Sequence, residues 1–226
     1  MLRLTTWNCC RGKPEVKLPR LLDLEPDIVV LQECARPSDL THGQHAWHGD
    51  NPRQGLLAFA HDGYQVSPIA RRRIAARLYF PVRISGAAEF NLLVVWVKPY
   101  KRPGGYMDSL LRGIAAYRDF ILSGPTVVVG DFNSAAYFGP AHCKMVTLLR
   151  ERYGLVSAYH ECYGLDHGSE TQFTYFDRTQ HGRPYHLDYC FVPQAWLPRL
   201  RNVVVGDPRD WRRFGDHVPL TVEIQI

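Results

Sequence analysis

The sequence has 226 residues, of which 46% are hydrophobic, and it carries a formal net charge of +5. A chain of this length and composition can bury a sizeable core, which excludes a disordered or low-complexity protein. The mild positive charge permits a polyanionic partner but does not require one.

Short apolar runs separated by polar links predict strands in the first half of the chain. The strand candidates cover residues 2–7, 28–33, 55–60, 78–84 and 90–97. A Ser-Gly pair separates the last two candidates, as in a hairpin. Residues 15–24 favour a short helix, although Pro19 limits it to its first turn or kinks it. The histidines His42, His45 and His48 fall in an expected exposed loop.

The second half predicts two longer helices and several further strands. Apolar faces and capping residues place the helices at residues 108–122 and 141–153. The strand candidates cover residues 126–129, 171–176, 187–192, 203–205 and 217–226. Strands and helices do not alternate regularly, which argues against a purely parallel doubly wound sheet. Two packed sheets with helices outside fit better, and the lack of linker or repeat patterns predicts one domain over residues 1–226.

The cysteine spacing and the absence of long apolar runs bear on cellular location. The six cysteines have no C-x-x-C spacing, and a disulfide framework is not expected at this length. They are Cys9, Cys10, Cys34, Cys143, Cys162 and Cys190. No apolar run approaches the roughly 20 residues that span a bilayer, and the first residues lack a secretory pattern. We therefore expect mostly buried, reduced thiols in a cytoplasmic protein without a membrane span.

The apolar run at residues 126–129 ends abruptly in Gly130-Asp131-Phe132-Asn133. Glycine lets the backbone turn or approach a neighbour closely. If the extended conformation continues, Asp131 and Asn133 point to the same side, beyond the end of a core strand. Taken alone, the stretch is better explained by an ordinary Asx turn, because Asp, Asn and Gly are common turn residues.

Polar groups at the ends of several other predicted strands favour a functional site over an ordinary turn. Together with the first pair they are Asn8, Glu33, Asp131, Asn133, Asp188, Asp216 and His217. Carboxylate and amide oxygens suit a hard cation such as Mg²⁺ or Mn²⁺. A single histidine among them suits a general base. Hydrolysis of a phosphodiester needs both parts, since a metal offsets the charge on phosphorus oxygens while a base activates water.

Five short motifs together resemble the endonuclease/exonuclease/phosphatase superfamily. In chain order they are Thr6-Trp7-Asn8, Leu31-Gln32-Glu33, Gly130-Asp131-Phe132-Asn133, His186-Leu187-Asp188-Tyr189 and Gly215-Asp216-His217-Val218-Pro219. Each motif alone is weak, but their joint occurrence in family order is specific and covers the whole chain. The resemblance implies a four-layer α/β/β/α sandwich, in which two packed mixed β-sheets are flanked by helices.

The resemblance also implies a metal site that binds Mg²⁺ or Mn²⁺. By this likeness, Glu33 is the principal metal ligand and Asn8 lies beside it to orient metal or phosphate. Asp216 matches a further family acid near the metal.

The remaining matched residues carry catalytic roles in the family. Asp131 is implied to position or deprotonate the attacking water, and Asn133 to hold a phosphate oxygen. His217 resembles the histidine that contacts the scissile phosphate or acts as base. Asp188 resembles its orienting carboxylate.

The chain departs from the family pattern at several positions. Cys10 stands where many relatives have an acid or a second amide. The segment after the strand at residues 90–97 offers Lys98 where many relatives have a Tyr or His that contacts phosphate. Our hypothesis is that Lys98 supplies the positive charge instead. Gly215 replaces a common serine.

Four further histidines receive other interpretations. His186 lies two residues from Asp188, and we favour a structural or packing role over contact with substrate. His160, His167 and His181 are expected in solvent-exposed loops, with no zinc spacing among them.

The substrate class is less sharply indicated than the chemistry. Basic runs interleaved with aromatic residues favour nucleic acid, because cations contact phosphates and rings stack on bases. These runs are Arg71-Arg72-Arg73, Lys98-Pro99-Tyr100-Lys101-Arg102 and Arg209-Asp210-Trp211-Arg212-Arg213. We expect a nuclease acting on DNA or RNA. The alternatives are a phosphoesterase for a small nucleotide, inositol phosphate or phospholipid headgroup, and a non-catalytic binding module on the same fold. The sequence indicates no protein partner.

Overall fold

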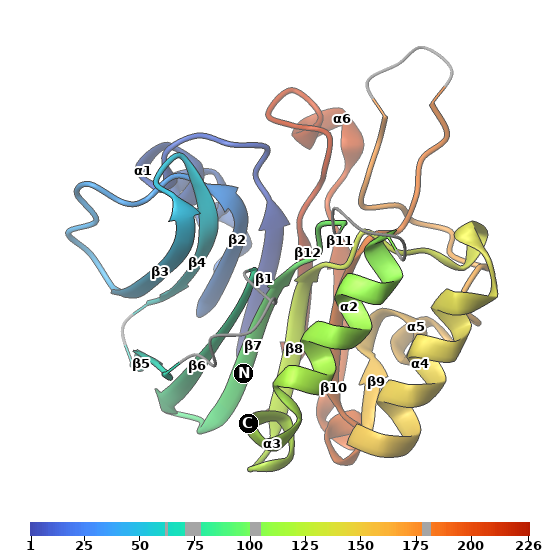
Figure 1. Cartoon of the computed structure of the whole chain (residues 1–226). Helices are drawn as coiled ribbons and strands as arrows, with labels where there is room; N and C mark the ends of the chain where they lie inside the picture. The colour runs from blue at the N-terminus through green and yellow to red at the C-terminus, as the bar shows by residue number, and fades with distance from the viewer. Residues whose placement is uncertain (62, 71–77, 100–104, 178–181) are drawn as a thin grey trace.

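The computed structural model describes residues 1–61, 63–70, 78–99, 105–177 and 182–226. Within these residues, twelve strands form two six-stranded sheets that pack face to face (Figure 1). The basic run at residues 71–73, most of the Lys98–Arg102 run and His181 lie outside the described residues. Among the described helices, none is long and apolar enough to cross a membrane.

The first sheet combines strands from both ends of the chain, in the order β11-β12-β1-β2-β4-β3. β1 and β2 are parallel, and the other neighbouring pairs are antiparallel. Its strands are β1 (Leu2–Asn8), β2 (Ile28–Cys34), β3 (Gln44–Asn51), β4 (Gln54–Ala60), β11 (Leu200–Val205) and β12 (Leu220–Ile224).

The second sheet has the order β5-β6-β7-β8-β10-β9. Only β7 and β8 are parallel among the paired strands described here. Its strands are β5 (Tyr64–Pro68), β6 (Tyr79–Gly86), β7 (Phe90–Trp96), β8 (Thr126–Asp131), β9 (Leu155–Ser157) and β10 (Asp188–Pro193). Both sheets are therefore mixed, which confirms the prediction.

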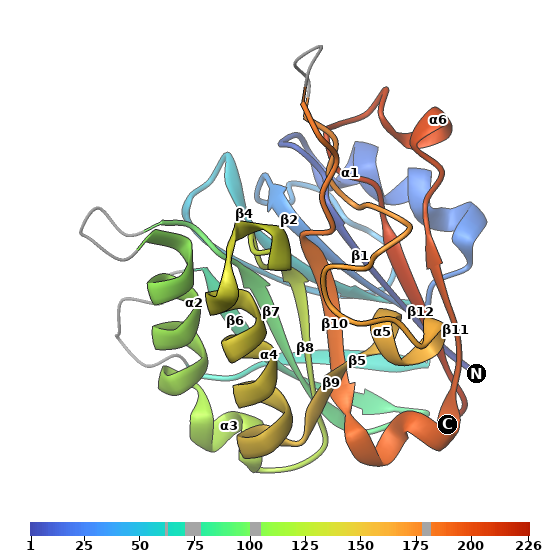
Figure 2. The ribbon, with the colours of Figure 1, turned by 90° about the vertical axis from the view of Figure 1, so that its right-hand side faces the viewer.

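Helices cover the outer faces of the two sheets (Figures 1 and 2). The second sheet carries α2, α3 and α4, whereas a short helix and a 3₁₀ turn, α1 and η1, cover the first. The helical segments are α1 (Pro14–Lys17), η1 (Leu18–Leu24), α2 (Gly105–Ala116), α3 (Arg118–Leu122), η2 (Ala136–Phe138), α4 (Pro140–Tyr153), α5 (Ala158–Tyr163), η3 (Gln194–Arg199) and α6 (Pro208–Trp211). The predicted four-layer α/β/β/α sandwich is thus confirmed.

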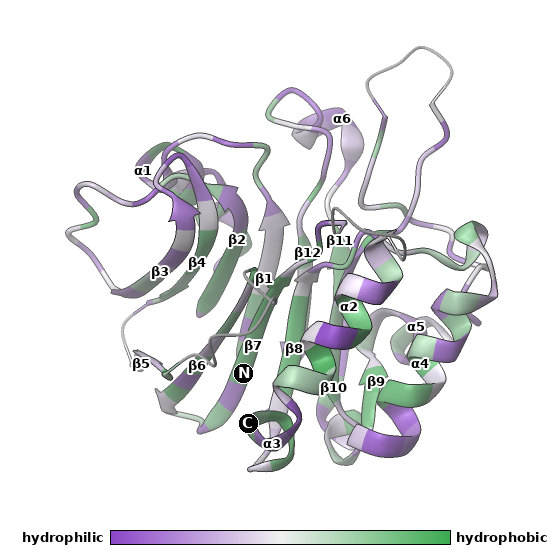
Figure 3. Cartoon of the chain, viewed as in Figure 1, coloured by the Kyte–Doolittle hydropathy of each residue, from purple (hydrophilic) through white to green (hydrophobic). Residues whose placement is uncertain are grey.

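The continuous apolar runs of the central strands follow from burial on both faces (Figure 3). In β2, Ile28 and Val30 face the core between the sheets, while Val29 and Leu31 pack under η1. β8 behaves alike, since its alternate valines enter the two cores on either side of the second sheet. Because both faces are buried, neither strand needs the polar alternation of a surface strand.

The expected exposed loop with His42, His45 and His48 is only partly correct. His45 and His48 lie in β3, and His48 is buried. This strand lacks β-branched residues, so its conformation comes from pairing with β4.

Several other boundaries also differ from the predictions. Residues 171–176 form no strand apart from an isolated bridge at Tyr175. The final strand begins at Leu220, and the helix predicted over 108–122 divides into α2 and α3 at Tyr117. β5, β9 and α5 were not predicted from the sequence.

Candidate active site

The ends of central strands from both sheets meet at one edge of the sandwich. Asn8 ends β1, and Glu33 lies one residue before the end of β2. Asp131 ends β8 in the other sheet, and Asp188 begins β10 directly opposite it in the antiparallel register. Polar side chains far apart in the sequence therefore converge here.

The backbone around these side chains adopts conformations that most residues avoid. Gly130 has a φ of +137°, and a Cβ there would lie 2.0 Å from the carbonyl oxygen of Val95. Only glycine fits at this position. The end of β8, with Asp131, can therefore pack closely against β7. Glu33 and Asn133 also have positive φ values, of 63° and 47°. Such conformations cost about 1–3 kcal/mol each and are common at functional sites.

A β-bulge explains the direction of Glu33. The register between β2 and β4 shifts between Gln32 and Cys34, so Glu33 is the extra residue on its strand. A bulge of this kind turns a side chain away from its regular direction. Glu33 is consequently half-buried at the site, whereas its neighbours remain within the core.

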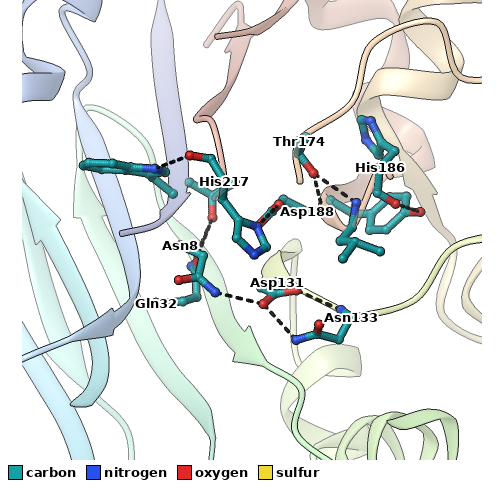
Figure 4. Close-up of polar contacts among 12 residues, drawn as sticks. Asn8, Gln32, Asp131, Asn133, Thr174, His186, Asp188 and His217 are labelled. Atoms are coloured by element: carbon teal, nitrogen blue, oxygen red, sulfur yellow. Dashed lines mark hydrogen bonds and ion pairs between the residues drawn. The ribbon is translucent and has the colours of Figure 1, made fainter. Parts of the chain in front are cut away.

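Asn8 connects a carboxylate of its own sheet with one of the other sheet. Its Nδ2 donates to Glu33 Oε1 at 3.2 Å. It also donates to Asp131 Oδ2 at 3.0 Å (Figure 4). Its Oδ1 accepts from the backbone N–H of Cys10 at 3.1 Å. The Cys10 side chain differs from the family pattern, but its backbone thus orients the Asn8 amide.

Asn133 orients Asp131 from the other side. Its backbone N–H donates to Asp131 Oδ1 and its Nδ2 to Asp131 Oδ2, both at 2.8 Å. The same Nδ2 donates to the carbonyl oxygen of Val97 at 3.0 Å. Burial raises the pKa of Asp131 to about 7, although the nearby His217 and the amide donors oppose this shift.

His217 forms a buried pair with Asp188. Its Nδ1 donates to Asp188 Oδ2 at 2.7 Å, so Nε2 is left for the cavity, and in Figure 4 the ring lies beside Asp131. Burial alone would lower the pKa of His217, but the Asp188 carboxylate raises it to about 9. The Asp188 carboxylate therefore favours the protonated form of this imidazole.

Residues that the sequence analysis missed hold this pair in place. Thr174 Oγ1 accepts from the backbone N–H groups of Leu187 and Asp188, each at 3.0 Å. Trp7 Nε1 donates to the carbonyl oxygen of His217 at 3.1 Å. Neither contact has a local signal in the sequence, since each joins segments that only the fold brings together.

Gln54 and Lys98 extend the network behind Glu33. Gln54 Nε2 donates to Glu33 Oε2 at 3.0 Å, and Lys98 Nζ donates to Gln54 Oε1 at 3.3 Å. Lys98 Nζ also lies 3.5 Å from the ring centroid of Trp96. Burial lowers the pKa of Lys98. Gln54 was missed because it is an ordinary polar residue at the start of a strand.

These side chains surround a cavity of about 650 Å³. Its lining includes seven of the eight predicted site residues, namely Asn8, Glu33, Lys98, Asp131, Asn133, Asp216 and His217. Asp188 is fully buried behind His217. The structure therefore brings all eight predicted residues together.

Aromatic rings extend from His217 to the protein surface. The Tyr175 ring lies 4.9 Å from that of His217, and the Tyr185 ring lies 4.9 Å from that of Phe138. Phe138 and the adjacent Tyr137 are 56% and 61% exposed. Large exposed rings next to a polar cavity are suited to stacking on a planar ligand.

His142, His160, His167 and His186 form a cluster of imidazole rings near the start of β10. His186 is buried, as expected for a structural residue, and its Nδ1 donates to the carbonyl oxygen of Gln172 at 3.0 Å. The expectation that His160 is solvent-exposed is wrong, because His160 is buried and contacts Glu170. His167 is half-buried beside it. Packing of α5 onto the second sheet, unseen in the sequence, buries these rings.

Comparison with known proteins assigns a family to this arrangement. The sequence model of the Endonuclease/Exonuclease/phosphatase family matches residues 5–217. The chain belongs to this family. Members of the endonuclease/exonuclease/phosphatase family hydrolyse phosphoester bonds with a divalent metal ion, and this chain is such a hydrolase. No curated protein sequence matches it.

Solved structures share the fold at low sequence identity. An AP endonuclease from Archaeoglobus fulgidus has a TM-score of 0.76 and 16% identity, with all of both chains covered. The 3′ phosphatase NExo from Neisseria, bound to a product DNA hairpin, has a TM-score of 0.74 and 20% identity, again over both whole chains. An AP endonuclease from Leishmania major has a TM-score of 0.76 and 12% identity, covering all of this chain and 88% of that one.

The donor set of the cavity fits the divalent ion on which this family depends. Glu33 and Asp131 are held by amide groups rather than by cationic side chains. Carboxylate and amide oxygens of this kind are the ligands that hard divalent cations prefer. Asp216 adds a further carboxylate to the cavity wall.

Proposed function

We propose that this enzyme hydrolyses phosphodiester bonds in DNA or RNA, using Mg²⁺ or Mn²⁺. One observation carries the proposal. The Asn8–Asp131–Asn133 hydrogen-bond network and His217, which pairs with Asp188, line the same cavity. This places a group that can accept a proton beside a group that is positively charged.

In this proposal Glu33, Asn8 and Asp216 hold the cation. A bound divalent ion would supply charge stabilisation for the phosphorus oxygens and the leaving group. Gln54 keeps Glu33 in its orientation, because it occupies the second carboxylate oxygen. Outer contacts of this kind are part of what sets the affinity of a metal site.

Asp131 is the proposed base for the attacking water. Its pKa of about 7 means that a substantial fraction is ionised at neutral pH, and the ionised form is still basic enough to accept a proton. Asn8 and Asn133 fix the direction of the carboxylate from two sides.

His217 is proposed to act mainly as a cation rather than as the base. Asp188 keeps it protonated, so Nε2 can donate a hydrogen bond to a phosphate oxygen. Lys98, which also lines the cavity, is proposed to add positive charge near the same oxygens. The Nδ2 of Asn133 already donates to Asp131 and Val97, which favours a positioning role for Asn133 over a direct contact with phosphate.

Nucleic acid is favoured by the surface around the cavity. The exposed rings of Tyr137 and Phe138 can stack on bases, and the guanidinium of Arg183 lies 4.5 Å from the Tyr137 ring centroid. The exposed arginines of the 209–213 segment adjoin the His217 motif. The DNA-directed activities named for the structural neighbours support the same substrate class. A cavity of about 650 Å³ also suits a small phosphoester, which remains the alternative.

The test is a substrate panel that separates these classes. Supercoiled plasmid, single-stranded DNA, RNA and a bis-aryl phosphodiester are each incubated with Mg²⁺, Mn²⁺ or chelator, using wild-type protein and Asp131→Asn. Metal-dependent cleavage of nucleic acid, lost in the variant, is the expected result. Cleavage of the small diester alone would keep the chemistry and overturn the nucleic-acid assignment. Cleavage that persists at the wild-type rate in Asp131→Asn would overturn the mechanism.

A cytoplasmic location remains a prediction. Cys9, Cys34 and Cys190 are buried thiols outside any disulfide, and burial raises the pKa of each. Thiols of this kind are typical of a reducing compartment.

A further inference from the structure

A second group of potential metal ligands lies outside the catalytic cavity. His160 comes from α5, and His167 and Glu170 come from the segment that follows it. Each of the three offers one ligand atom, and these atoms all lie within 4.8 Å of one another. His160 Nε2 and Glu170 Oε1 are separated by 3.1 Å.

We propose that His160, His167 and Glu170 form a second metal site that binds Zn²⁺ or a similar transition-metal ion. Two imidazoles and one carboxylate are a ligand set that Zn²⁺ favours over Mg²⁺, which prefers oxygen ligands alone. The site is separate from the Glu33 centre and does not depend on the activity proposed above.

One pair of donors already has the spacing of a tetrahedral site, and all three donor atoms lie within 4.8 Å of one another. Metal–ligand distances of about 2.0–2.1 Å place tetrahedral donors about 3.3 Å apart. The 3.1 Å between His160 and Glu170 matches this edge. The rings of His160 and His167 stack with centroids 3.5 Å apart and an angle of 14° between planes. A metal therefore requires the two rings to tilt apart, so that both nitrogens point at one position.

Outer hydrogen bonds leave one nitrogen of each imidazole for the metal. Ser157 Oγ bonds His160 Nδ1 at 2.8 Å, which leaves Nε2. His142 Nε2 bonds His167 Nδ1 at 3.0 Å, which also leaves Nε2. The Ser157 hydroxyl can accept as well as donate, so the His160 proton can move to Nδ1 when Nε2 binds the metal. No net proton release from this ring is needed. Such outer partners are the usual support of metal-binding histidines.

The site has a route to solvent. A cavity of about 230 Å³ reaches Glu170, Gly168 and His186. His167 itself is only half-buried. A small hydrated ion can therefore approach the donors without unfolding the segment.

A metal bound here would hold in place the segment that connects α5 to the active site. The segment after α5 continues from Glu170 to Thr174, whose hydroxyl holds the backbone of Asp188. It then continues to Tyr175, whose ring packs on His217. The structural consequence of metal binding is a fixed path for this segment rather than a new reactive group.

The test measures zinc bound to the whole protein. Wild type and variants are loaded with Zn²⁺ in excess Mg²⁺, desalted and analysed by mass spectrometry for metal content. Circular dichroism checks the fold. One retained equivalent is expected in wild type and in the catalytic-cavity variant Glu33→Gln. His167→Gln and Glu170→Gln are each expected to weaken zinc binding by more than about 100-fold, and Ser157→Ala by about 10–100-fold.

Cobalt provides a readout of coordination that does not depend on stability. Co²⁺ in a tetrahedral site shows intense visible d–d bands, which are expected in wild type and Glu33→Gln and absent in Glu170→Gln. Two results would overturn the proposal. One is wild-type protein that retains no zinc under these conditions. The other is zinc that is lost in Glu33→Gln but kept in both His167→Gln and Glu170→Gln, which would place the ion in the catalytic cavity.

Discussion

The catalytic cavity and the histidine cluster shift the pKa of histidine in opposite directions. His217 contacts the Asp188 carboxylate, and its pKa rises to about 9. In the cluster, burial lowers the pKa of His142 to about 4 and that of His186 to about 4. The neighbouring imidazoles add to this effect, because each disfavours a positive charge on the others.

This difference explains why the two regions suit different ligands. A protonated imidazole repels metal ions and attracts phosphate, whereas a neutral imidazole offers a lone pair to a metal. His186 and Asp188 are only two residues apart in the chain, yet they serve different regions. Local sequence therefore does not determine the chemistry of a histidine here. The nearest charged partner and the depth of burial do.

The largest expected difference between the catalytic cavity and the histidine cluster is in the rate of hydrolysis. Asp131→Asn keeps the shape of the side chain but removes the base, so kcat should fall by about 10²–10⁴-fold. Zinc content should not change, because Asp131 lies outside the cluster. Steady-state kinetics and metal analysis on the same preparation check both points, with Asp23→Asn on the exposed surface as the matched control. An unchanged kcat would remove Asp131 as the base.

The pH profile should report the charge on His217. The wild-type rate should rise as Asp131 ionises through about pH 7 and fall as His217 loses its proton through about pH 9. Asp188→Asn removes the carboxylate that raises the His217 pKa, so the alkaline limb should move to lower pH. Hydrolysis rates measured from about pH 5 to about pH 10 cover the titration of both Asp131 and His217, and they test the expected shift. An alkaline limb that stays in place would show that Asp188 does not hold the proton on His217.

Zinc should stabilise the fold through the cluster. At a free concentration about 100 times its dissociation constant, a ligand adds about 2.7 kcal/mol to the free energy of unfolding. For a chain of this size, that shift raises Tm by about 5–10 °C. Differential scanning fluorimetry should show this rise in wild type and Glu33→Gln but not in Glu170→Gln. An equal rise in Glu170→Gln would argue that zinc stabilises through another site.

The smallest effect should come from the rim between the two regions. Arg183 lies over Tyr137 and also lines the smaller cavity beside the cluster. If Arg183 contacts a phosphate, its replacement by Gln should make the plot of log binding constant against log salt concentration less steep by about one unit. Fluorescence anisotropy across a salt series measures this, with Arg118→Gln, on the exposed surface of α3, as control. Equal slopes for the two variants would remove Arg183 from the binding surface.

Much of the central architecture follows from the sequence because it rests on short-range patterns. The apolar runs of β1, β2, β7 and β8 mark strands buried on both faces, and the prediction of two packed sheets is confirmed. β3 was missed because its residues favour a loop and only pairing with β4 holds it extended. The helix predicted at 15–24 is a short helix followed by a 3₁₀ turn that begins at Leu18 and has Pro19 near its start.

The residues at the ends of the central strands could be predicted from the sequence, because a change from apolar to polar side chains is local and can be read directly. Seven of the eight predicted residues line one cavity, and Asp188 lies behind His217. The support that Gln54 and Thr174 give them, and the meeting of His160, His167 and Glu170, depend on the fold. Those contacts join segments whose distance in space bears no relation to their distance in the chain. The pKa shifts of His217, His142 and His186 depend on such contacts, and so does the ligand that each region can bind.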